Sequence, residues 1–162
     1  MSTAQTILRS YRTPGAVLKR FRDDGADEGL ALTWLLVACI LFFVARLPGL
    51  ARTAHLNGDE TPLFGLALGT FFGTILLAPL FFYVLAALSH LVAKIVGGSG
   101  RWLDARLALF WALLAATPLV LLRGLVAGFI GEGPQLTLVS FVAFAGFLYI
   151  WLRGLIALER AT

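Results

Sequence analysis

The chain has 162 residues, of which 59% are hydrophobic and 14% are charged, and its formal net charge is +4. A soluble domain carries roughly 45–50% apolar and about 25% charged residues, because polar groups must cover its surface. This composition excludes an ordinary water-soluble fold and predicts a protein embedded in lipid.

Four long runs of the sequence contain no charged residue; they cover residues 29–45, 61–93, 107–122 and 133–152. A helix needs about 20 apolar residues to cross the hydrocarbon core of a bilayer. We therefore expect an all-α, polytopic transmembrane bundle with four crossings, and five crossings are the alternative. The helices should cover about residues 29–48, 62–96, 103–130 and 135–158, between an N-terminal segment, 1–28, and a tail, 159–162.

The N-terminal segment combines a helix-start signal with an amphipathic pattern. Thr13 followed by Pro14 is typical of an N-cap and the first helical position. Apolar residues at helical spacing then alternate with cations, which predicts a short helix lying on the inner leaflet. A docking surface for a partner is the alternative. The residues expected to contact the leaflet are Arg12, Lys19, Arg20 and Arg22.

The run of residues 61–93 is long for one crossing, but it lacks the polar turn that two crossings would need. We interpret it as one helix that begins at a second cap signal, Thr61–Pro62, and is kinked at Pro79. Gly65, Gly69 and Gly73 recur every four residues and lie on one face of this helix. Small residues at this spacing let helices approach closely, within the bundle or across a homodimer.

The connection after this helix contains GGSG, residues 97–100, which matches the GxSG pattern of rhomboid-type intramembrane serine proteases. Such a site needs a histidine on a later membrane helix, whereas His55 and His90 both precede Ser99. We interpret GGSG as a flexible linker and His90 as a polar group at the inner interface. We expect no catalytic residue, no metal and no cofactor.

The third crossing carries a ridge of small residues that matches the glycine face of the second. This ridge consists of Ala108, Ala112 and Ala116, continued by Gly124 and Gly128. Pro118 predicts a second kink, because proline removes a backbone donor inside a helix. Carbonyls freed at Pro79 and Pro118 could together border a small cleft.

Lysine and arginine are unevenly distributed across the four expected crossings. Ten of the thirteen lie on the side of the two termini, and only Arg46, Arg52 and Arg123 lie on the other. The positive-inside rule then places both termini in the cytoplasm. We expect a bacterial inner-membrane protein whose surroundings are the lipid bilayer, with no nucleic-acid partner.

The sequence ARLALFWALLAATPLVLL, residues 105–122, followed by GLVAGFIGEGP, residues 124–134, resembles the bacterial branch of the Yip domain family of multi-pass membrane proteins. The Thr13–Pro14 helix and the order of the hydrophobic segments are similar too. The resemblance implies a non-enzymatic membrane protein, since eukaryotic relatives act in vesicle traffic and bind prenylated Rab-type GTPases. This sequence lacks their long polar N-terminus, their Asp-Leu-Tyr-Gly-Pro motif and their usual fifth crossing. Rab-type GTPases are therefore not expected as partners.

Two hypotheses about function follow. The first is a membrane scaffold, adaptor or accessory subunit that contacts a membrane-protein partner, or a second copy of itself, through helix faces. The alternative is a small transporter or lipid-handling protein with a cleft near Pro79 and Pro118.

Overall fold

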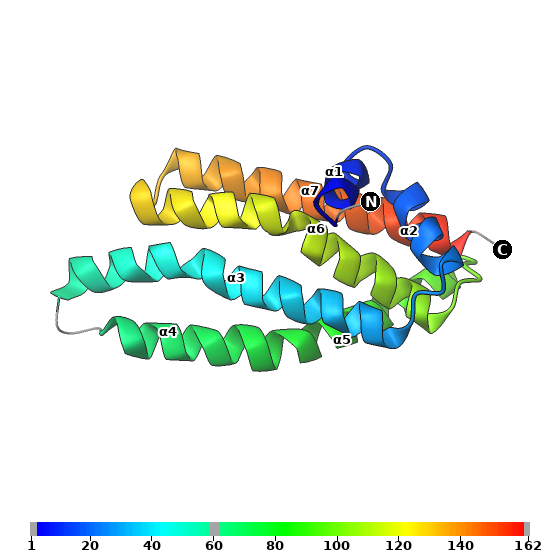
Figure 1. Ribbon diagram of the computed structural model, residues 1–162, viewed down its shortest axis with the longest axis horizontal. Helices are drawn as coiled ribbons and strands as arrows, with labels where there is room; N and C mark the ends of the chain where they lie inside the picture. The colour runs from blue at the N-terminus through cyan, green and yellow to red at the C-terminus, as the bar shows by residue number, and fades with distance from the viewer. Residues whose placement is uncertain (1–2, 59–61, 161–162) are drawn as a thin grey trace.

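A computed structural model describes residues 3–58 and 62–160, and these residues form a bundle of helices without a strand. Two short helices come first, and four long helical segments follow (Figure 1). The elements are α1 (Thr3–Ser10), α2 (Pro14–Asp23), α3 (Glu28–Asn57), α4 (Leu63–Phe71), the π-helix η2 (Phe72–Leu77), α5 (Ala78–Ile95), α6 (Trp102–Phe129) and α7 (Pro134–Glu159). Local signals explain two of these starts. Pro14 occupies the first turn of α2, but the Thr13 side chain forms no capping hydrogen bond and donates instead to the Arg9 carbonyl at 3.5 Å. The Asp27 carboxylate caps α3 by accepting from Leu30 N at 2.8 Å. The cap signal at Thr61 lies outside the described residues.

Four helical segments of the described chain are long and apolar enough to cross a membrane: Glu28–Asn57, Leu63–Ile95, Trp102–Phe129 and Pro134–Glu159. The prediction of four transmembrane helices is confirmed, and so is the single long second segment. The first helix ends at Asn57 instead of near residue 48, because Pro48 is accommodated inside it. We call the end of the bundle that holds Glu159 and the start of α3 the termini end, and the opposite end the distal end.

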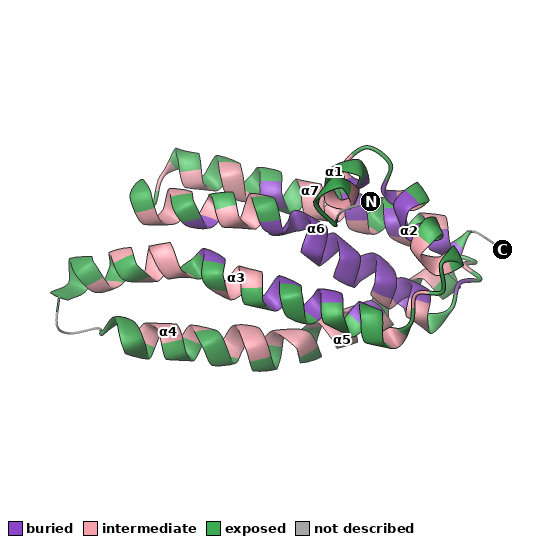
Figure 2. Ribbon diagram, viewed as in Figure 1, coloured by how far each residue is buried: buried purple, intermediate pink, exposed green. Residues whose placement is uncertain are grey.

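Helix α6 forms the centre of the bundle, and α3, α5 and α7 pack around it. In its most apolar stretch 56% of the residues are buried, compared with 6% in the second segment. Figure 2 shows this buried half of α6 surrounded by more exposed helices. The predicted small ridge lies in this core, since Ala108, Ala112 and Ala116 are all buried.

The contact between α3 and α6 depends on two glycines at the distal half of α6. A Cβ atom at Gly124 would collide with the Ala45 carbonyl, and one at Gly128 would collide with the Pro48 ring. The two backbones therefore touch, which is how helices gain dispersion energy in lipid, where the hydrophobic effect contributes little.

The irregularity in the second segment is a π-helical turn directly before Pro79. Proline has no N–H, so the carbonyl of Ile75 loses its α-helical donor. The chain responds over residues Phe72–Leu77, where the spacing of hydrogen bonds widens and Ala78 N donates to Gly73 O. This turn keeps α4 and α5 joined as one membrane-length segment.

Helix α6 passes through Pro118 and changes direction along its length (Figure 1). The Leu114 carbonyl, which loses its donor at Pro118, accepts from the Thr117 hydroxyl at 2.7 Å. The next carbonyl, that of Ala115, accepts from the Tyr11 hydroxyl at 2.7 Å. The N-terminal segment therefore supplies a donor to the proline break of the central helix.

The two N-terminal helices pack on the side of the bundle formed by α6 and α7 (Figure 1). In α2, Val17 and Leu18 are buried, and Leu18 lies over Gly154 of α7, where a Cβ atom would collide with it. Gly15 leaves room for Ala157. The apolar face of α2 thus contacts protein, and its location on the inner leaflet stays a prediction.

Candidate functional site

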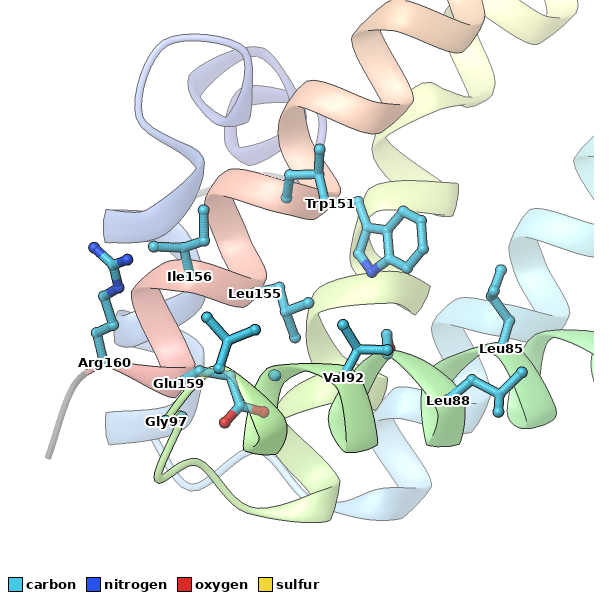
Figure 3. A pocket seen from close by; sticks show the side chains of 14 residues that line it. Leu85, Leu88, Val92, Gly97, Trp151, Leu155, Ile156, Glu159 and Arg160 are labelled. Carbon is cyan, nitrogen blue, oxygen red and sulfur yellow. The ribbon is translucent and has the colours of Figure 1, made fainter.

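An apolar groove of about 440 Å³ lies between α5 and α7 at the termini end (Figure 3). Both helices rest on α6, so the groove has two helical walls. Leu85, Leu88 and Val92 line it from α5, and Trp151 and Leu155 line it from α7. Such a groove offers shape and dispersion contacts to an apolar occupant, and its walls contain little that could react.

The groove is closed at one end by a buried carboxylate. Glu159 is 4% exposed, and its Oε1 lies 2.9 Å from Nδ1 of His90, which is fully buried. The other oxygen, Oε2, accepts from Gly100 N at 2.9 Å. A buried carboxylate is tolerated only when such partners replace water. We call this arrangement the Glu159 latch, since it ties the end of α7 to α5 and to the loop before α6.

The sequence GGSG, residues 97–100, forms the loop of this latch. A Cβ atom at Gly98 or Gly100 would lie 2.7 Å from the Glu159 carboxylate, so only glycine lets the loop close over it. Ser99 N and Ser99 Oγ both donate to the Glu159 carbonyl, at 3.1 and 3.3 Å. Gly97 N and Gly98 N donate to the Lys94 and Ala93 carbonyls of α5. The interpretation of GGSG as a flexible linker is wrong, because α5 holds the first half of the loop and Glu159 of α7 holds the second half.

His90 lies near the termini end of α5, and its position at the inner interface stays a prediction. Its side chain is fully buried within the protein, and its ring lies 4.5 Å from that of Trp102, centroid to centroid. Its Nε2 and the Nε1 of Trp151 have no hydrogen-bond partner among the described residues. Sequence reasoning missed Glu159 as the partner of His90, because 69 positions separate them. The one available signal was Glu159 itself, the only acidic residue in α7.

The residues predicted to pack helices have two different surroundings. Ala108, Ala112 and Ala116 lie in the core. Gly69 and Gly73 have no neighbouring atom within 4 Å of where a Cβ would stand, and Gly65 has only Pro62 at 4.0 Å. The glycine face is therefore open within this chain, and its role in helix packing stays a prediction.

The predicted kinks and leaflet contacts are also located. A cavity of about 570 Å³ lies beside both proline breaks and is lined by Ala78 and Phe82 near Pro79 and by Val120 near Pro118. Three of the predicted leaflet contacts, Arg12, Lys19 and Arg20, are exposed. The fourth, Arg22, donates to the Leu158 carbonyl at 3.4 Å, which satisfies a free carbonyl at the end of α7.

The long apolar helices, the central helix and the lateral groove define a multi-pass helical membrane protein. The chain belongs to the Yip1 domain family, whose family model matches residues 8–160. This family is not known as an enzyme family. Comparison with curated proteins and with solved structures finds no significant match.

Proposed function

We propose that the protein is a non-enzymatic membrane scaffold, adaptor or accessory subunit that holds a helix of a membrane partner in the groove between α5 and α7. The proposal places it in a bacterial inner membrane with both termini in the cytoplasm, because ten of its thirteen cations lie at that end. The observation that carries the proposal is the groove itself, whose two apolar walls, α5 and α7, both pack on α6.

The dimensions of the groove suit a helix. Its lining runs from Leu85 to Val96, the C-cap of α5, and from Trp151 to Arg160, the C-cap of α7. Each wall spans roughly three helical turns, or about 16 Å. A partner helix lying between these walls would contact two helices at once, which increases its dispersion contacts in lipid. The Glu159 latch holds both walls in place from one end.

A pair of neighbouring residues on α5 provides the test. Val92 lines the groove and is 60% exposed, whereas Leu91 is 46% exposed and lies outside it. Val92→Trp should fill the groove and reduce the amount of complex recovered in mild detergent. Leu91→Trp adds the same bulk to the same helix and should leave the complex intact.

The readout is the mass of the tagged protein on a native gel after cross-linking in intact membranes. Folding of each variant is checked by circular dichroism and by size-exclusion chromatography. A wild-type protein that runs as a monomer with lipid alone, or an equal effect of both substitutions, would contradict the proposal.

The alternative, a small transporter or lipid-handling protein, is favoured by the cavity beside the two proline breaks. Flux distinguishes the two functions. A transporter reconstituted in vesicles should move an ion, a solute or a labelled lipid, and Pro118→Ala should change the rate. A scaffold should show no protein-dependent flux.

A further inference from the structure

The three cations at the distal end line one cleft. Arg46 and Arg52 from α3 and Arg123 from α6 border a cavity of about 630 Å³, and Glu132 is the acidic residue that borders it within residues 3–58 and 62–160. These are all the lysines and arginines that the sequence places on that side of the membrane. Arginines scattered over the surface would serve solubility, but arginines clustered around one cleft raise the local positive potential and attract an anion.

The three guanidinium groups keep free donors. Arg52 donates to the Gly128 carbonyl at 3.3 Å, and Arg123 Nε donates to the Ser140 hydroxyl at 2.8 Å. Arg46 forms no hydrogen bond or ion pair with the residues that the structure describes. Each guanidinium has five N–H donors, so most of these donors remain available to a ligand.

The cleft continues from the charged mouth into an apolar cavity. Arg46 and Thr70 border both the charged cavity and the cavity of about 570 Å³ beside the proline breaks. On α3, Phe42 lies one turn deeper than Arg46, and on α6, Val120 lies deeper than Arg123. Each helix therefore presents a cation at the mouth and an apolar side chain below it.

The mouth lies at the edge of the hydrocarbon core. Arg46 is the first charged residue after the run 29–45, and Arg123 is the first after the run 107–122. Arginine at this depth is costly without a counter-ion, and long side chains there reach toward headgroups. A phosphate group at the mouth would supply that counter-ion through charge-assisted hydrogen bonds.

We propose that this distal cleft binds an anionic phospholipid. Its phosphate contacts Arg46 and Arg123, and one acyl chain lies along Gly69 and Gly73 toward Phe82. The open glycine face acquires a role in this arrangement, because a side chain at Gly73 would occupy the path of the acyl chain. The site is separate from the groove between α5 and α7, so its failure would leave the proposed scaffold function untouched.

The test titrates the full-length protein in a neutral detergent with phosphatidylglycerol and follows bound lipid by native mass spectrometry. Phosphatidylcholine with the same acyl chains and inorganic phosphate are the comparison ligands. Phosphatidylglycerol should bind tighter than phosphatidylcholine, and inorganic phosphate should compete weakly. Equal binding of both lipids, or full displacement by inorganic phosphate, would overturn the proposal of an anionic lipid.

Two pairs of variants locate the site. Arg46→Gln should weaken phosphatidylglycerol binding by about tenfold, as expected for the loss of a charge-assisted hydrogen bond. Lys94→Gln removes the same charge from the opposite end and should have little effect.

Gly73→Leu should block the acyl chain, whereas Gly65→Leu, outside both cavities, should not. Neither glycine has a crowding neighbour, so both variants should fold. Unchanged binding in both Arg46→Gln and Gly73→Leu would refute the site.

Discussion

At the scale of single residues, the Glu159 latch is the least expected feature of the protein. A carboxylate that is 4% exposed sits at the end of an apolar helix, and it is accepted because His90 and the Gly100 amide replace its water. The latch joins three segments that are distant in sequence. Removing one partner of the latch should therefore cost more stability than removing one partner of a surface ion pair, such as Arg20 with Asp24 at 3.5 Å.

His90→Ala should destabilise the protein strongly, because it leaves the Glu159 carboxylate buried with one partner fewer. Removing one partner of a buried pair costs about 3–5 kcal/mol. Glu159→Gln removes the charge; its amide oxygen can accept from Gly100 N while its NH2 group donates to Nδ1 of the neutral imidazole, so this variant should cost less. Unfolding in detergent, followed by circular dichroism, measures both changes. His55→Ala, at the exposed end of α3, is the matched control, and an equal loss in both histidine variants would contradict the latch.

At the scale of elements, the break at Pro118 ties the N-terminal segment to the central helix. Tyr11 donates to the Ala115 carbonyl, and Trp111 Nε1 of α6 donates to the Ser10 hydroxyl at 2.8 Å. Ser10 is fully buried. The N-terminal helices are therefore part of the folded bundle, and they supply α6 with a hydrogen-bond donor beside its proline break.

Tyr11→Phe should reduce stability, since it removes the hydrogen bond from the Tyr11 hydroxyl to the Ala115 carbonyl; such a bond contributes about 0.5–1.5 kcal/mol. Burial raises the pKa of Tyr11 above its ordinary value of 10.0. A raised pKa in the folded state means that the stabilisation is complete below pH 10.0 and is lost as pH rises through the folded pKa. The stability difference between wild type and Tyr11→Phe should thus be constant at neutral pH and shrink in strong alkali. A difference that already falls near neutral pH would contradict this role.

The packing of α3 against α6 makes a second prediction at this scale. Gly124→Leu would force a side chain into the Ala45 carbonyl, and a backbone group cannot move aside easily. This variant should be recovered poorly from membranes or unfold at lower temperature. Gly69→Leu, where nothing lies within 4 Å, should keep the wild-type melting temperature in detergent. Equal losses for the two variants would show that glycine matters here for reasons other than helix contact.

At the scale of the whole molecule, four crossings bring the two termini to one end of the bundle. The structure agrees with this, since Arg22 near the N-terminus contacts Leu158 near the C-terminus. The termini end is tied together further by Glu28, whose carboxylate accepts from Tyr83 OH at 3.0 Å and pairs with Arg106. Both ends of the chain should therefore lie on the same side of the membrane.

Reporter tags at the N-terminus and at the C-terminus should be accessible from the same side, and the positive-inside rule predicts the cytoplasmic side. A tag fused after residue 131, behind the third crossing, should report the opposite side. Protease or labelling reagents applied to intact cells and to inverted vesicles measure this. Termini on opposite sides would require an odd number of crossings and would contradict the topology with four crossings.

Much of the architecture was predictable from the sequence. A bilayer demands an apolar helix of a certain length, so the uncharged runs alone predicted four membrane segments and kept the second one whole across Pro79. The start of α2 at Pro14 and the small ridge of the third crossing were visible for similar reasons, because a proline in the first turn and a row of small residues are both properties of one helix.

The sequence by itself therefore determined which segments enter the membrane, since that property belongs to each segment alone. Only the tertiary structure decided which distant residues meet. It brought His90 to Glu159, closed GGSG over that carboxylate, turned the apolar face of α2 toward α7 and gathered three arginines around one cleft. Lipid is as apolar as the helices within it, so the pattern of apolar residues marks insertion but does not select the face each helix presents to its neighbours.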